Sequence, residues 1–260
     1  MADGASEASV GLVLSTTTQK RVAVERTFCR KRRRLVAAIT KRDVQAKRIR
    51  RTRKTVLTSA RLTVEQMRHG GFRGRWAMLT TTYRAEARWV ASDVRALLDH
   101  CRKYAARCGF RLCYVWALEL TDAGRPHYHV LMWLPKGRTL PKPDKQGWWK
   151  HGSTRIEWAK KAVGYIAKYA SKGIDAESMS EIPKGARMCG NGGLNKQGRI
   201  ELRWWKLPTW VREVWPYVTD VARIKGGYVE RSTGEFLASP FTCDFQGGVL
   251  LVFQKGSELR

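Results

Sequence analysis

The stretch GRPHYHVLMWLP, residues 124–135, places His127 and His129 one residue apart at the head of an apolar run. Successive side chains of a strand point to opposite faces, so both imidazoles would project to one side and Tyr128 to the other. Two imidazoles on one face can chelate a single metal ion. The chain has only five histidines, and this pairing therefore indicates a metal site, with a buried structural pair as the competing interpretation.

A third ligand is expected from the preceding segment, FRLCYVWALELT, which the turn residues DAGRP join to the histidines. A tight turn brings Glu119 within reach of the same spot, and His151 in the following loop is the competing ligand. Two nitrogens and one carboxylate leave coordination positions open, as a catalytic metal needs. The hard oxygen ligand favours Mg²⁺ or Mn²⁺.

The segment VGYIAKYASKG, residues 163–173, is predicted to be helical, with its apolar residues buried. The opposite face then carries a stripe of Tyr165, Lys168, Tyr169 and Lys172. A phenol, with an ordinary pKa of about 10, is a poor nucleophile until a cation stabilises its anion. Lys168 and a nearby metal would supply that cation, and a phosphodiester would be the substrate that needs such neutralisation. The predicted chemistry is attack of a tyrosine oxygen on DNA.

Three segments in this order, LTTTY (79–83), HYH (127–129) and YIAKY (165–169), resemble the three motifs of the HUH endonucleases that initiate rolling-circle replication. The resemblance covers about residues 76–172, and the tyrosine pair with its intervening lysine is most similar to the initiators of single-stranded DNA bacteriophages. It implies a ferredoxin-like antiparallel palm and a metal site completed by Glu119.

The same resemblance implies an enzyme that nicks DNA, stays covalently attached to the 5′ end and later rejoins the displaced strand. Tyr165 would attack first, because Lys168 matches the family's Tyr-x-x-Lys spacing, and Tyr169 would act at termination. A transposase, a plasmid-mobilisation relaxase and a non-enzymatic basic nucleic-acid-binding protein remain the alternatives.

The expected substrate is single-stranded or locally melted origin DNA. We expect the following residues to contact it: Thr80, Thr82, Arg84, Lys172, Arg32, Arg33 and Arg34. The chain has no G-x-x-x-x-G-K-[ST] run, so a host helicase and polymerase are expected as partners. Tryptophans 148, 149, 204 and 205 are weaker candidates for stacking on unpaired bases.

Around the site, the pattern predicts strands at 75–84, 110–121 and 127–135, and helices at 93–109 and 154–172. This order predicts an α+β fold, with helices packed on one face of an antiparallel sheet. The glycine-rich residues 189–198 are expected to form a surface loop or a phosphate contact, and residues 226–237 a hairpin.

The formal net charge is +28, which suits a polyanionic partner. Residues 20–54 alone contain 16 Lys and Arg against two acidic residues. We therefore expect a basic arm over 1–70, either helical on DNA or partly disordered, whose removal weakens DNA binding without removing the chemistry. The catalytic core would span 71–180 and a tryptophan-rich extension 181–260.

No apolar run approaches the roughly 20 residues of a membrane span, and the N-terminus does not resemble a secretion signal. The expected location is the cytoplasm of a bacterial host, with no membrane partner.

Overall fold

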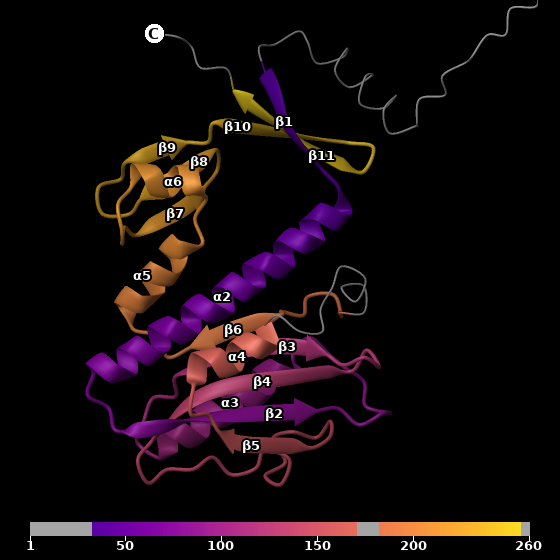
Figure 1. The fold of residues 1–260 in the computed structure, drawn as a ribbon, viewed down its shortest axis with the longest axis vertical. Coiled ribbons are helices and arrows are strands. Elements are labelled where there is room, and N and C mark those ends of the chain that lie inside the picture. The colour runs from indigo at the N-terminus through magenta and orange to yellow at the C-terminus, as the bar shows by residue number, and fades with distance from the viewer. Residues whose placement is uncertain (1–32, 171–181, 256–260) are drawn as a thin grey trace, which may run out of the picture. The chain divides into compact units, whose positions relative to one another are not determined.

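The computed structural model of the protein describes residues 33–170 and 182–255 (Figure 1). These residues fall into two compact units. The larger runs from Lys41 to Ala238 and contains all three motifs, whereas the smaller contains three strands from the two ends of the described chain.

The smaller unit is an antiparallel sheet in the order β1-β11-β10, made of β1 (Arg33–Ile39), β10 (Phe241–Gln246) and β11 (Val249–Lys255). The expectation of a helix in the basic arm is therefore wrong at 33–39. Leu35 and Ile39 are half-buried while Val36 between them is exposed, which is the alternation of a strand. Pairing with β11, more than 200 residues later in the chain, overrides the local helical spacing.

The larger unit is built around a five-stranded sheet in the order β5-β2-β4-β3-β6, in which every pair is antiparallel. Its strands are β2 (Gly74–Thr82), β3 (Tyr114–Leu120), β4 (Pro126–Pro135), β5 (Thr154–Trp158) and β6 (Cys189–Gly192). The predicted α+β class with an antiparallel sheet is confirmed.

Helices cover both faces of this sheet rather than one. Helix α3 (Asp93–Arg107) packs Leu97 and Cys101 against one apolar face. On the other face, α2 (Lys41–His69) and α4 (Ala162–Ala170) enclose a second cluster. The uninterrupted apolar run of β4 explains this arrangement, because a strand buried on both sides needs apolar residues at every position.

Helix α2 is part of this core, although the sequence grouped it with the basic arm. Its second half buries Val56, Ala60, Leu62 and Met67. Its first half, up to Arg53, has no buried residue and is rich in exposed Lys and Arg. The high charge of the first half masked the apolar face of the second.

Residues 154–158 were predicted to begin a helix and instead form β5, the edge strand beside β2. The helix begins at Ala162. In this segment polar residues alternate with Ile156 and Trp158, a short pattern that pairing with β2 stabilises.

The glycine-rich segment was also misread, because Cys189–Gly192 forms edge strand β6 rather than a loop. A Cβ on Gly190 would lie 2.5 Å from the indole of Trp116, and one on Gly192 would lie 2.5 Å from the ring of Tyr114. The glycines therefore let the strand cross two aromatic side chains of β3.

The rest of the larger unit contains α5 (Lys196–Trp205), α6 (Thr209–Val214) and a small antiparallel sheet, β7-β8-β9. Its strands are β7 (Val221–Ile224), β8 (Gly227–Glu230) and β9 (Phe236–Ala238). Pairing of β8 with β9 confirms the predicted hairpin. Among the described residues, no helix is long and apolar enough to cross a bilayer.

Candidate metal centre and tyrosine pair

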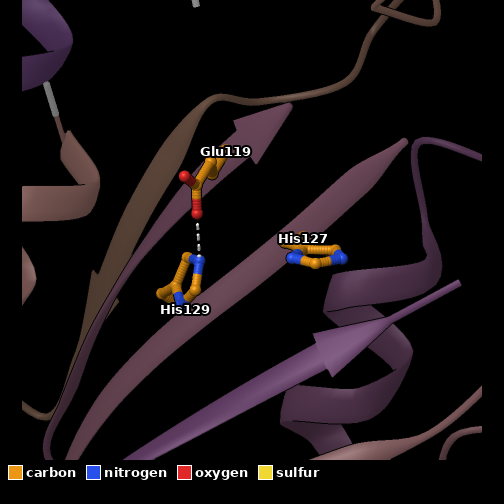
Figure 2. A group of neighbouring side chains, drawn as sticks. All are labelled: Glu119, His127 and His129. Atoms are coloured by element: carbon orange, nitrogen blue, oxygen red, sulfur yellow. Dashed lines mark hydrogen bonds and ion pairs between the residues drawn. The ribbon is translucent and has the colours of Figure 1, made fainter. Parts of the chain in front are cut away.

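Three potential metal ligands, Glu119, His127 and His129, meet on the face of the sheet that α2 and α4 cover (Figure 2). Glu119 on β3 lies directly opposite His127 on β4, and His129 follows two residues later on the same face. The three ligand atoms all lie within 4.8 Å of one another. Strand alternation and the tight turn thus bring the predicted residues together.

His129 is held from both sides of its ring. Its Nε2 lies 2.6 Å from Oε2 of Glu119, and its Nδ1 lies 3.1 Å from Oγ1 of Thr80. The His129 side chain is 4% exposed and that of Glu119 is 9% exposed. A hydroxyl both donates and accepts, so Thr80 can orient the ring with either nitrogen protonated.

The electrostatic environment favours neutral His127. Burial lowers its pKa below the ordinary histidine value, the neighbouring His129 lowers it further, and Glu119 opposes both effects. A neutral imidazole is the form that coordinates metals. Two imidazole nitrogens and one carboxylate, gathered in a largely buried cluster, therefore form a donor set that fits a divalent ion with coordination positions to spare.

His151, the alternative third ligand, lies elsewhere. Its Nε2 is 3.5 Å from Oδ1 of Asp93, and its ring packs against Tyr83 and Trp149. Tyr83 and Trp149 belong to the cluster under α3, on the opposite face of the sheet. Of the two candidates, only Glu119 joins the histidine pair.

The two tyrosines of α4 have different partners. The ring of Tyr169 stacks on the imidazole of His129, with centroids 3.5 Å apart. Tyr165, whose ring centroid is 5.9 Å from that of Tyr169, donates its hydroxyl hydrogen bond to Glu157 at 2.9 Å. Lys168 is exposed, with Nζ 5.7 Å from the centroid of the Tyr169 ring.

Glu157 is a site residue that the sequence analysis missed, because it fell inside the mispredicted helix. It accepts a hydrogen bond from Tyr165 and forms an ion pair with Arg155 at 2.5 Å. The hydrogen bond to Glu157, together with burial, raises the pKa of Tyr165 to about 12. The alternating pattern TRIEW was the signal that could have identified it as a strand residue paired with Met78.

The residues predicted to contact DNA are scattered. Thr80 binds His129, and Thr82 lies opposite His127. Arg84 is exposed and donates to the backbone oxygen of Lys150 at 2.6 Å.

The other predicted DNA contacts are far along the chain from this site. Arg33 and Arg34 lie on β1 in the smaller unit, whereas Arg32 and Lys172 lie outside the described residues. Of the tryptophans proposed to stack on bases, Trp149 and Trp204 are buried, and Trp148 stacks on His100.

Comparison with known families gives one match. Residues 76–174 match the model of a family of replication-associated proteins, described as the ORF2 type. The matched segment begins in β2, includes Glu119 and both histidines, and extends past both tyrosines of α4. This match is consistent with a rolling-circle replication initiator. Searches of curated proteins and of solved structures gave no match.

Proposed function

We propose that this protein is a metal-dependent, site-specific DNA nickase and strand transferase that initiates and terminates rolling-circle replication. The observation that carries the proposal is the buried Glu119, His127 and His129 group with the Tyr169 phenol stacked on one of its members. A phenol beside a candidate metal centre suits transfer of a phosphoryl group to tyrosine. The match to a replication-associated family supports the same assignment.

Glu119, His127 and His129 would hold the metal, and Mg²⁺ or Mn²⁺ suits a set that includes a carboxylate and keeps positions for a phosphate oxygen. A bound ion would polarise the scissile phosphate and neutralise part of its charge. Thr80 would fix the His129 ring through Nδ1, and such outer contacts tune the affinity of metal sites.

The reacting group of the first cleavage would be the Tyr169 oxygen. It bonds to phosphorus while the bond to the 3′ oxygen breaks, which leaves a 5′-phosphotyrosyl linkage and a free 3′ hydroxyl. The phenol releases its proton and the departing 3′ oxygen takes one up. Lys168, whose ammonium lies near the Tyr169 ring, would stabilise the phenolate.

Tyr165 would act in the second cleavage that ends a round of replication. The Tyr-x-x-Lys spacing favours Tyr165 for the first attack, but the geometry supports the reverse order. Tyr169 lies against His129, whereas Tyr165 is held by Glu157 and has a raised pKa. Release of Tyr165 from Glu157 would free its oxygen while Tyr169 still holds DNA.

The substrate would be single-stranded or locally melted origin DNA, as in the initiators of single-stranded DNA bacteriophages. The 3′ hydroxyl left by the nick would serve a host polymerase, and a host helicase would separate the strands. This activity would take place in the cytoplasm of a bacterial host.

A covalent adduct tests the proposal. The protein is incubated with single-stranded fragments that tile the DNA on which its gene lies, with and without Mn²⁺, and analysed on a denaturing gel. We expect a protein–DNA band that needs both one particular fragment and the metal. DNA binding without any adduct would favour a non-enzymatic binding protein, and an adduct on other mobile-element ends would favour a transposase or relaxase.

A further inference from the structure

Away from the metal centre, the basic first half of α2 faces α5 across a shallow hollow of about 440 Å³. Its lining consists of Arg50, Arg53, Lys54, Leu57, Thr58, Arg61 and Trp205. The α2 members recur at intervals of three and four residues, which places them along one stripe of the helix. We call this hollow, together with the adjoining Tyr217 and Arg212, the α2–α5 surface.

The two helices are fixed relative to each other by packing and by an ion pair. Leu62 of α2 is buried with Leu194 and Leu202 in a small apolar cluster. Arg61 of α2 donates to Glu201 of α5 at 2.7 Å. The hollow is therefore built into the larger unit.

Glu201 also sets the aromatic rings of the surface. It accepts hydrogen bonds from Nε1 of Trp205 at 3.2 Å and from the hydroxyl of Tyr217. Burial acts to raise the pKa of Glu201, but hydrogen bonds from Tyr217, Arg61 and Trp205 lower it below the usual value. An ionised carboxylate thus holds two aromatic side chains, of which Trp205 is half-buried and Tyr217 is 56% exposed.

The cations around these rings lack counter-charges. Within the described part of the chain, Arg50, Arg53, Lys54 and Arg212 form no ion pair. Nζ of Lys54 lies 5.9 Å and the guanidinium carbon of Arg212 lies 5.8 Å from the centroid of the Trp205 ring. Burial lowers the pKa of Lys54, and the charge of Arg212 lowers it further. A bound polyanion would relieve this uncompensated positive charge.

We infer that the α2–α5 surface binds an unpaired DNA strand, with bases stacked on Trp205 and Tyr217 and the flanking phosphates on Arg50, Arg53 and Lys54. Cations beside exposed aromatic rings are the combination that binds single strands, because only unpaired bases can offer their faces. The inference rests on the proposed function only for the choice of DNA as the polyanion. No residue of the surface belongs to the metal centre, so the surface would hold the strand at a second place.

The test is fluorescence anisotropy of the full chain with labelled oligo(dT) of about 20 nucleotides, longer than the roughly 4–16 nucleotides that one compact binding fold occupies. Trp205→Ala should weaken binding about five- to a hundredfold, since stacking contributes about 1–3 kcal/mol per base. Trp205→Phe keeps a ring and should retain most of the affinity. Phe236→Ala, at an exposed aromatic residue on β9, is the matched control.

The charge component is tested separately by salt dependence. Lys54→Gln and Arg53→Gln should each reduce the slope of log affinity against log salt concentration by about 0.7, whereas Trp205→Ala should leave the slope unchanged. Lys103→Gln, at an exposed lysine of α3, is the control for loss of one charge. Circular dichroism and melting verify that each variant is folded.

Two results would overturn the inference: affinity of folded Trp205→Ala equal to that of Phe236→Ala, or equally tight binding of duplex and single-stranded DNA by the wild-type chain. Adduct formation separates this inference from the proposed function. Trp205→Ala should still form the metal-dependent adduct at saturating DNA. Stacking-dependent binding in a chain that never forms an adduct would uphold the surface while refuting the nickase.

Discussion

The ring of Tyr169 lies nearly parallel to the imidazole of His129, with centroids 3.5 Å apart and planes 13° apart. His129 comes from β4 and Tyr169 from α4, so packing of the helix on the sheet sets this contact. Tyr165, one turn earlier, is bound to Glu157 instead. The two phenols therefore start from different environments, and their variants should behave differently.

His127→Ala and His129→Ala should each abolish cleavage while leaving DNA binding largely intact, because phosphate contacts rather than the metal dominate affinity. Loss of an outer partner of a metal ligand costs roughly 10–100-fold, so loss of the ligand itself should cost at least about 100-fold in Mn²⁺ affinity. Electron paramagnetic resonance measures the bound Mn²⁺. His69→Ala, at the exposed end of α2, is the control. Weakened DNA binding with unchanged cleavage would argue against a metal role.

The third ligand is tested by Glu119→Gln beside His151→Gln. Glutamine keeps the shape of Glu119 and a hydrogen bond to His129 but removes the charge that a hard metal needs. We expect Glu119→Gln to lose Mn²⁺ binding and cleavage, and His151→Gln to keep both, because His151 pairs with Asp93. Full cleavage by Glu119→Gln together with its loss in His151→Gln would show that the assignment is reversed.

Glu157→Gln should lower the pKa of Tyr165 from about 12 toward the ordinary tyrosine value of about 10, because a neighbouring carboxylate disfavours the phenolate. Ultraviolet titration of the phenolate should then show about one more tyrosine ionising below a pH of about 11 than in the wild-type protein. The double variant Glu157→Gln/Tyr165→Phe should not show this extra titration. An unchanged titration curve in Glu157→Gln would mean that Glu157 does not control Tyr165.

The packing of α2 predicts that it belongs to the folded core. Leu62→Ala should lower the free energy of unfolding by about 2–5 kcal/mol, because Leu62 is 5% exposed. Val44→Ala, at a residue that is 51% exposed in the first half of the helix, should change it by less than about 0.5 kcal/mol. Deletion through residue 67 should therefore abolish cooperative melting. A cooperatively melting deletion with normal adduct formation would restore the idea of a dispensable arm.

Local rules were sufficient to group the metal ligands. Alternation along a strand put His127 and His129 on one face, and a tight turn put Glu119 beside them. The tyrosine stripe likewise followed from helical spacing alone. The His129–Tyr169 contact could not be predicted, since it depends on how α4 crosses the sheet.

The errors share one physical cause, which is pairing between distant segments. Strand β1 is held by β11, and β5 by β2, and neither partner can be recognised from the local pattern. Glu157 was missed for this reason, because its partner Tyr165 comes within reach only when residues 154–158 form a strand. The charge of α2 hid its buried face in the same way, since that face matters only against the sheet.

The most direct test of the central claim is to follow adduct formation by Tyr165→Phe, Tyr169→Phe and the double variant on the cleaved single-stranded fragment with Mn²⁺, with the linked tyrosine identified by peptide mass spectrometry. We predict that Tyr169→Phe loses most of the first-cleavage adduct, that Tyr165→Phe still cleaves but fails in the second cleavage and rejoining, and that the double variant forms no adduct. A metal-dependent covalent adduct in the double variant would contradict the account.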